Sequence, residues 1–398
     1  MPLDRYATGL ARQILGAACG TDTEARQIVA EAAAAGSEPM LQFARLTGEN
    51  EAAIYARGAR SVGLAFAEDI PGAVVLKPHD VDPARLGEMH SIRGTLIDQD
   101  VLFAAPGFAQ LAALGRRVRR EPDLARQICL VPPRRLRTHL ARAHRETLME
   151  RALGRLATRW PRASAHKELT WRVRTGFALM LLAAVGLAAL LPGFVLYLAA
   201  PVLALVYLAP AGLRLVAAVM GFMHPHREQL APLSDAELPV YTVLVPLRDE
   251  AELVPQLINA MLALDYPRDR LDIKFVVEET STDTLAALRP LMAVGPFELI
   301  EVPDGEPRTK PKAMNFALPL ARGELLVVYD AEDVPEPDQL RLAAAKFESR
   351  PELDCLQAEL VIDNAAESVL TALFTAEYAA QFGLVLPALA RLGLPMPL

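Results

Sequence analysis

Cysteine is scarce in this sequence: three of the 398 residues are Cys, namely Cys19, Cys129 and Cys355. None lies in a C-x-x-C pair or in a Cys/His cluster with zinc spacing, so the pattern excludes a disulfide scaffold and indicates a reducing compartment. Aromatic residues make up only 6%. No basic segment is interleaved with aromatics and no nucleic-acid reader motif occurs, so we expect no nucleic-acid partner.

The glycine-rich phosphate motifs are also missing. Neither G-x-G-x-x-G nor G-x-x-x-x-G-K-[ST] occurs, which leaves the usual dinucleotide-binding and P-loop interpretations without support. An apolar content of 52% excludes an intrinsically disordered chain, and the length allows two or three domains with cores of their own.

Charge is absent from one long stretch. Residues 177–213 are 37 consecutive residues without a charged side chain. A single helix of that length would measure about 55 Å, against about 30 Å for the hydrocarbon core of a bilayer. The turn signal Pro192-Gly193 lies near the middle of the run. We therefore predict a transmembrane hairpin within residues 175–222, with spans at 175–191 and 194–213. A buried helical pair in a soluble protein is the alternative.

The basic residues predict the orientation of the hairpin. Residues 116–174 carry 17 basic and 5 acidic side chains, whereas residues 228–398 carry 13 basic and 29 acidic ones. The basic block is interpreted as a juxtamembrane helical region that stays cytoplasmic and contacts anionic lipid. A hairpin returns the chain to the same side. The expected location is the bacterial inner (cytoplasmic) membrane, multi-pass, with the soluble domains facing the cytoplasm.

Residues 1–115 are predicted to form a small α+β accessory domain. Amphipathic helical segments such as 23–35 precede short apolar runs at 72–76, 95–97 and 101–105. The order of elements is weakly similar to the amino-terminal domains of type II secretion ATPases. No motif here is specific enough to indicate a ligand.

Residues 235–398 alternate strand and helix patterns, which predicts a parallel sheet covered on both faces. The expected strands are 241–245, 273–277, 297–302 and 325–329, and the expected helices are 249–264, 284–292, 312–321 and 337–348. A further apolar segment, 365–390, is interpreted either as an interfacial membrane helix or as an ordinary core helix.

Acidic residues follow two of these strands: E-E-T-S-T-D at 278–283 and D-A-E-D at 330–333. Ligands of parallel sheets bind beyond the carboxyl ends of the strands. Carboxylates gathered there repel one another unless a cation lies between them, and a hard divalent cation bridging to a diphosphate suits such oxygen ligands.

Four motifs carry a resemblance. V-P-L-R-D-E at 245–250 resembles V-P-x-x-x-E, and V-E-E-T-S-T-D at 277–283 resembles V-D-D-G-S-x-D with glutamates in place of aspartates. K-P-K-A-M-N at 310–315 resembles K-x-x-A-L-N, and D-A-E-D at 330–333 resembles a D-x-D motif. In this order they are similar to glycosyltransferase family 2, the cellulose-synthase-like enzymes, in the branch of the phage-adsorption protein B type. The resemblance implies a GT-A (Rossmann-like) α/β domain over residues 235–398.

The resemblance also implies a set of site residues. Nucleotide-sugar binding is expected from Pro246, Glu250, Glu278, Glu279, Lys310 and Asp330, and binding of Mg²⁺ or Mn²⁺ from Asp330, Glu332 and Asp333. The implied activity is that of a membrane-bound inverting glycosyltransferase of the hexosyltransferase type, with a role in polysaccharide biosynthesis. A UDP-sugar is the expected donor, and a saccharide or lipid-linked molecule is the acceptor.

The general base is not found. In the family it lies in a T-E-D segment followed by an arginine/tryptophan signature, and neither occurs here. We therefore expect the base beyond Leu398 in a longer protein, and little activity from this truncated chain alone. The alternatives are a non-catalytic membrane scaffold or a nucleotide sensor that carries a degenerate glycosyltransferase domain.

Overall fold

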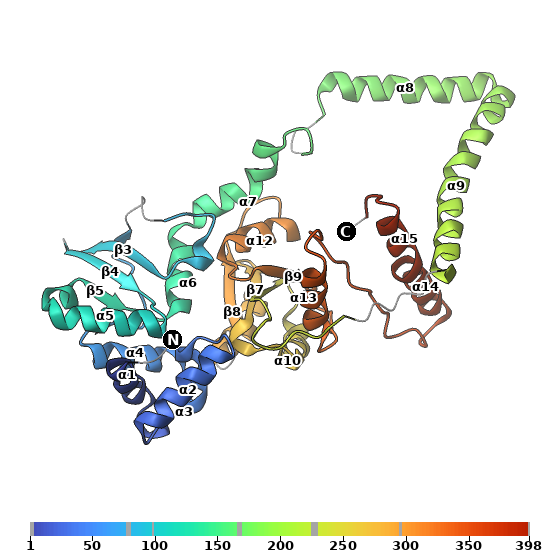
Figure 1. The fold of residues 1–398 in the computed structure, drawn as a ribbon. Coiled ribbons are helices and arrows are strands. Elements are labelled where there is room, and N and C mark those ends of the chain that lie inside the picture. The colour runs from blue at the N-terminus through green and yellow to red at the C-terminus, as the bar shows by residue number, and fades with distance from the viewer. Residues whose placement is uncertain are drawn as a thin grey trace. The chain divides into compact units, whose positions relative to one another are not determined.

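The computed structural model describes residues 4–76, 81–97, 99–164, 169–223, 230–293 and 297–396. They fall into two compact units (Figure 1). The first unit combines Met1–Ala163 with Ala231–Glu348, and the second combines Ser164–Leu230 with Ser349–Leu398. Within the first unit we distinguish the N-terminal part, residues 4–163, from the parallel-sheet part, residues 231–348.

The N-terminal part contains both helices and strands. Its first helices are α1 (Arg5–Leu15), α2 (Asp22–Ala34), α3 (Pro39–Thr47) and α4 (Glu51–Val62). The side chains of Asp4, Thr21 and Asn50 accept hydrogen bonds from backbone N–H groups and so cap α1, α2 and α4. A mixed sheet of order β1-β5-β4-β3-β2 follows, with β1 (Ala65–Phe66), β2 (Val75–Leu76), β3 (Ser91–Leu96), β4 (Gln99–Ala104) and β5 (Ile128–Leu130).

Helix α5 (Phe108–Arg120) runs across the boundary expected at residue 115. The basic block then supplies α6 (Pro133–Ala143) and α7 (Arg145–Arg159), which belong to the N-terminal part. Arg137 of α6 is buried. Part of the block expected beside the membrane is thus folded into the first unit, which net charge along the chain does not reveal.

The parallel-sheet part holds four strands in the order β8-β7-β6-β9, all parallel. They are β6 (Tyr241–Leu247), β7 (Leu271–Glu278), β8 (Phe297–Val302) and β9 (Leu325–Val328), so each predicted strand is observed. Tyr241 pairs with both Leu271 and Leu325, and Ile273 pairs with Phe297. Every residue of β7 is buried, as expected for a central strand.

Helices cover both faces of this sheet. On one face, α10 (Val254–Ala263), α11 (Thr282–Leu288) and α13 (Gln339–Ser349) share a core with Val243, Phe275 and Val277. On the other, α12 (Lys310–Ala317) and the short η8 (Leu318–Leu320) pack on Leu244, Val276 and Ile300. This second core continues into the N-terminal part without a break, so the two parts share one hydrophobic cluster.

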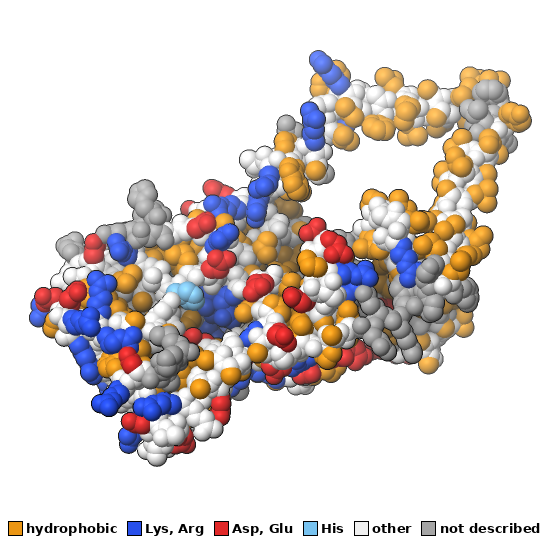
Figure 2. Space-filling model, viewed as in Figure 1, with side chains coloured by type: hydrophobic (Ala, Val, Ile, Leu, Met, Phe, Trp, Pro, Cys, Tyr) orange, Lys and Arg blue, Asp and Glu red, His pale blue; other side chains and the backbone are white. Residues whose placement is uncertain are grey.

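The second unit contains α8 (Trp171–Leu190) and α9 (Pro192–Met223), and a carboxy-terminal helix composed of α14 (Val369–Ala380), the π-helical η9 (Gln381–Val385) and α15 (Leu386–Arg391). Among the residues that the structure describes, three segments are long and apolar enough to cross a membrane: Trp171–Leu190, Ala199–Gly221 and Val369–Arg391. Figure 2 shows hydrophobic side chains along α8 and α9.

The predicted break between the two hairpin helices is observed, because α8 ends at Leu190 and α9 begins at Pro192. However, α9 does not end near Leu213. It continues through Arg214, whose guanidinium forms an ion pair with Glu377 of α14. The charge that was taken to end the span is therefore paired within a longer helix.

Candidate functional site

The turn after β6 holds Glu250 close to the sheet. Asp249 adopts a left-handed backbone with φ 58°, a conformation that Asp tolerates better than most side chains. The backbone N–H of Glu250 donates to Oγ1 of Thr284 (3.0 Å), which is fully buried on α11. The Glu250 carboxylate in turn accepts from the backbone N–H of Arg248 (3.2 Å). Both contacts fix Glu250 at the carboxyl end of β6.

Asp330 lies two residues beyond β9, at the same edge of the sheet. Lys310, the first residue of α12, donates to its carboxylate. The backbone N–H of Asp330 donates to Oδ2 of Asp333 (2.7 Å), which closes a short turn. Glu332 is exposed in this turn, and no hydrogen bond or ion pair joins it to the residues that the structure describes.

The acids at the ends of β6 and β9 act on one another electrostatically. Partial burial raises the pKa of Glu250, and the negative charges of Glu332, Asp330 and Asp249 raise it further. Lys310 offsets part of this charge through Asp330. The structure thus brings Glu250, Asp330, Glu332 and Lys310, four of the predicted residues, into one neighbourhood.

Glu278 faces the interior of the protein instead. Its Oε1 lies 2.9 Å from Nζ of Lys312, and both side chains are almost fully buried. Lys312 also donates to the carbonyl of Gly305 (2.7 Å). Two buried oxygens, Oε2 of Glu278 and Oγ of Ser281, have no hydrogen-bond partner among the described residues. Glu278 therefore supports the loop before α12 from inside.

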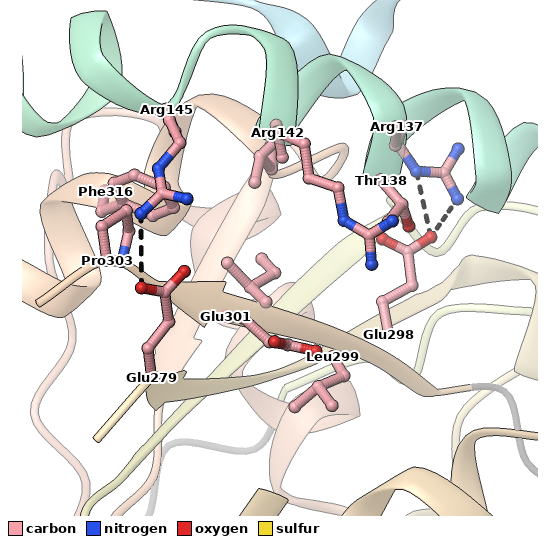
Figure 3. A pocket seen from close by; sticks show the side chains of 13 residues that line it. Arg137, Thr138, Arg142, Arg145, Glu279, Glu298, Leu299, Glu301, Pro303 and Phe316 are labelled. Atoms are coloured by element: carbon pink, nitrogen blue, oxygen red, sulfur yellow. Dashed lines mark hydrogen bonds and ion pairs between the residues drawn. The ribbon is translucent and has the colours of Figure 1, made fainter. Parts of the chain in front are cut away.

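Glu279 points into a cavity of about 260 Å³. Its Oε2 lies 3.3 Å from Nη2 of Arg145 on α7, and Arg142 reaches toward the same space from α6 (Figure 3). The other lining residues are Arg137, Thr138, Ala141, Glu298, Leu299, Ile300, Glu301, Pro303, Phe316 and Leu320. Adjacent in sequence, Glu278 and Glu279 thus have different partners, and neither contacts Lys310 or Asp330.

Pro246 lies within β6, paired in register with Val276 of β7. A proline lacks the N–H that a central strand uses, so its place one residue before the end of β6 is where the ladder best tolerates it. The residue is half-buried and helps to lead the chain into the turn that carries Glu250.

Sequence reasoning missed three residues of this region: Thr284, Lys312 and Arg145. Lys312 lies inside the quoted K-P-K-A-M-N motif, where only Lys310 was given a role. Two residues apart on a helix, these lysines point to different sides. Arg145 comes from a distant segment, and no local signal connects it with Glu279.

Carboxylate oxygens are the ligands that Mg²⁺ and Mn²⁺ prefer, so the donor chemistry of Asp330, Glu332 and Asp333 fits such an ion. Within the described part of the chain, however, no three His, Cys, Asp or Glu side chains are gathered as a metal site would require. Asp330 is engaged by Lys310, and Asp333 by a backbone N–H.

Comparison with known proteins finds a family model that is similar to part of this chain. Residues 239–391 match the family model described as glycosyltransferase like family 2. A probable glycosyltransferase, YdaM of Bacillus subtilis, is 28% identical over 137 residues, which cover 34% of this chain and 33% of YdaM. The β-monoglucosyldiacylglycerol synthase of Synechocystis is 29% identical over 140 residues, or 35% and 29% of the two chains.

The chain thus spans about a third of the length of the curated relatives that it matches. Among solved structures, the mannosyltransferase PcManGT from Pyrobaculum calidifontis in complex with GDP-Man and Mn²⁺ is similar at 30% identity, covering 35% of this chain and 41% of that one, with a TM-score of 0.31. S. aureus TarS with UDP-GlcNAc is 19% identical, covering 31% and 41%, with a TM-score of 0.26.

Proposed function

We propose that this chain forms the donor-binding part of a membrane-bound inverting glycosyltransferase. The donor is a nucleoside-diphosphate sugar, in our proposal a UDP-sugar, and the acceptor is a saccharide or a lipid-linked molecule. The family match of residues 239–391 supports glycosyl transfer. The proposal further takes the enzyme to lie in the bacterial inner membrane, with its family 2 domain on the cytoplasmic side.

One observation carries the proposal: Lys310 and the acids Asp330, Glu332 and Glu250 gather at the carboxyl ends of β6 and β9. A diphosphate needs cationic groups, and carboxylates at its edge suit ribose hydroxyls or a bridging cation. Because Glu278 is buried, we expect other residues to contact the base of the nucleotide. Glu279 keeps its proposed role, because it is about one third exposed and lines the cavity.

In the proposed reaction an acceptor oxygen attacks the anomeric carbon, and the bond from that carbon to the diphosphate oxygen breaks. The nucleoside diphosphate leaves with the bonding electron pair, and the acceptor proton passes to a general base. Lys310 would stabilise the charge that develops on the leaving diphosphate. A divalent ion held by Asp330, Glu332 and Asp333 would supply further charge stabilisation there. We assign no residue of this chain as the base.

The three apolar helices support membrane attachment of the enzyme. Relatives named β-monoglucosyldiacylglycerol synthase make a lipid acceptor reasonable for this chain as well. We therefore place the acceptor in or beside the bilayer, either as a lipid or as a growing polysaccharide.

The deciding experiment is calorimetric titration of the full chain in detergent with UDP in the presence and absence of Mn²⁺. We expect metal-dependent binding by the parent, and loss of that binding in Asp330→Ala. Glu348→Ala, which removes an exposed acid from the end of α13, is the matched control and should bind as the parent does.

Equal binding by the parent and by Asp330→Ala would refute the assignment of the site. No binding of UDP by the parent would favour the non-catalytic scaffold, in which the family 2 domain only holds partners.

A further inference from the structure

A row of buried charges leads from the N-terminal part across the parallel sheet. Arg137 of α6, whose side chain is 7% exposed, donates from Nε (3.0 Å) and from Nη2 to Oε1 of Glu298 on β8. The other carboxylate oxygen of Glu298 lies 2.6 Å from Nζ of Lys274 on β7. Lys274 is completely buried and also lies 2.9 Å from Oδ1 of Asp272.

The row ends at the turn that begins β9. Asp272 accepts from Nε of Arg322 (3.0 Å) and from the backbone N–H of the same residue (3.0 Å). Its neighbour Thr242 on β6 donates to Asp272 (2.9 Å) and accepts from the backbone N–H of Gly323 (2.8 Å). A side chain at Gly323 would bring a Cβ within 2.4 Å of the Thr242 nitrogen, so the turn lies directly against β6.

The partners of Glu298 explain why the row needs Arg137. Burial by itself would raise the pKa of Glu298, but the charges of Arg137 and Lys274 outweigh it and hold that pKa well below the ordinary value. Without Arg137, Oε1 of Glu298 loses both of its donors, and Glu298 depends on Lys274, which it shares with Asp272. The remaining groups must then shift, and the backbone N–H groups of the turn are among them.

A second contact from the N-terminal part reaches the same turn. Gly87 of η3 (Leu86–Glu88) lies against η8, where an added Cβ would be 2.2 Å from the carbonyl oxygen of Ala321 and 2.5 Å from that of Leu320. Only glycine leaves room for this approach, because both obstructing atoms belong to the backbone. The turn at residues 320–323 is therefore held from two sides, by Gly87 and by the charge row.

We propose that Arg137 and Gly87 are positioning residues for the family 2 domain: they fix the turn at residues 320–323 and thereby the strand that carries Asp330. Among the described strands, β9 is an edge strand that pairs with β6 alone, over four residues, so its start has few other restraints. Asp330 lies seven residues after Gly323. The N-terminal part then acts on the donor site without touching it, and the effect on the donor rests on the proposed function above.

The test uses the full chain in detergent and two readouts. Amide hydrogen exchange of residues 322–330 reports on the turn and β9, with a peptide from α2 as internal reference. UDP binding with Mn²⁺ reports on the site. For Arg137→Met and Gly87→Ala we expect about tenfold faster exchange in 322–330 and about tenfold weaker UDP binding, each equivalent to about 1.4 kcal/mol, with the α2 peptide unchanged.

Matched controls separate positioning from general damage. Arg135→Met removes an exposed arginine from the same helix, and Gly72→Ala adds a Cβ where nothing lies within 4 Å. Both should behave as the parent. Arg137→Lys should recover most of the protection, because it restores the charge beside Glu298.

Arg137→Met combined with Glu298→Met replaces the ion pair by an apolar pair, a change that buried pairs often tolerate. We expect this double variant to be folded, with slow exchange in 322–330, even if Arg137→Met alone does not fold. Fast exchange in a folded double variant would overturn the proposal, as would unchanged exchange in both single variants. If the parent binds no UDP, the proposed function fails, while the exchange data still decide the positioning role.

Discussion

Glu278 and Lys312 form an ion pair with almost no solvent contact, at the edge of the sheet where the donor is proposed to bind. Lys312→Met would leave the Glu278 carboxylate buried without a counter-charge and would free the carbonyl of Gly305. We expect a loss of about 3–5 kcal/mol in the free energy of unfolding. Unfolding of the full chain in denaturant measures it.

Lys310→Met is the matched comparison for this prediction. It breaks the ion pair with Asp330, in which both side chains are about half exposed, so a loss of only about 0–1 kcal/mol is expected. Equal losses for the two variants would contradict the view that Lys312 is a structural cation and Lys310 a site cation.

The raised pKa of Glu250 predicts that the stability of the protein depends on pH. Its pKa is raised in the folded state, by burial and by the neighbouring acids, so the folded protein favours the protonated form. Glu250 contributes its full stabilisation when the pH is below the ordinary pKa of a glutamate, about 4.3. This stabilisation is lost as the pH rises through the raised pKa of the folded state. The Glu250→Gln variant does not undergo this loss. Its melting temperature should therefore rise relative to that of the parent as the pH rises through that interval.

Thermal unfolding of the two proteins over a series of pH values checks this expectation. Glu252→Gln, a change of an exposed glutamate on the following turn, should run parallel to the parent. If the melting temperatures of Glu250→Gln and the parent differ by the same amount at all pH values, burial and the neighbouring acids do not raise the pKa of Glu250.

The adjacent pair Glu278 and Glu279 marks the limit of sequence reasoning about the site. Residues that follow one another in a strand point to opposite sides, so at most one could face a given ligand. Which one is buried depends on Lys312, which reaches Glu278 across 34 positions, and on Arg145, which reaches Glu279 across 134. The spacing of the sequence motifs gives no information about either contact. Asp330 and Lys310 lie closer to elements with a clear pattern, because Asp330 comes two residues after β9 and Lys310 begins α12; their roles in a site remain predictions.

At the scale of elements, strands with buried apolar runs were predicted best. β8 was expected at 297–302 and is found there, and the other three strands differ from prediction by a few residues at their ends. α12 begins at Lys310, two residues earlier than expected, because Pro311 is tolerated in the first helical turn. The second span was predicted to end at Leu213, whereas α9 continues to Met223, one residue beyond the end predicted for the hairpin.

The ion pair of Arg214 with Glu377 predicts how the carboxy-terminal helix is held. Gly221 of α9 packs closely on Leu384, since a Cβ at Gly221 would lie 2.5 Å from Leu384 Cδ2. In a Gly221→Cys/Leu384→Cys variant we expect rapid oxidative crosslinking. Adding Glu377→Ala should slow it severalfold, because an unpaired Arg214 in an apolar setting draws away toward water.

Exchanging the charges, with Arg214→Glu and Glu377→Arg together, should restore the crosslinking rate. The rate is followed by the shift of the crosslinked chain on non-reducing gels. A rate that is the same with and without Glu377 would show that apolar packing alone joins α9 to the carboxy-terminal helix.

At the scale of the whole molecule, the N-terminal part and the parallel-sheet part share one hydrophobic cluster, and ion pairs such as that of Arg137 with Glu298 also join them. Phe316 and Leu320 of the sheet part belong to the same cluster as Leu140 and Leu148 of the N-terminal part. Arg270 adds polar contacts by donating to the carbonyl of Ala35 (3.1 Å). Sequence patterns predicted separate domains, because a helix face that packs on a distant sheet looks the same as one that packs locally.

This shared cluster predicts that the two parts stay together when the chain is cut. With a protease site inserted between Ala163 and Ser164, where one compact unit ends and the other begins, cleavage should leave the N-terminal fragment bound during gel filtration in detergent. High salt should not release it, because apolar burial is not screened as ion pairs are. Phe316→Asp, which buries a charge in the cluster, should release the fragment at the same salt concentration. If the parent fragment elutes alone, the N-terminal part is a tethered module, and its positioning of the turn before β9 would have to depend on the intact chain rather than on the packing.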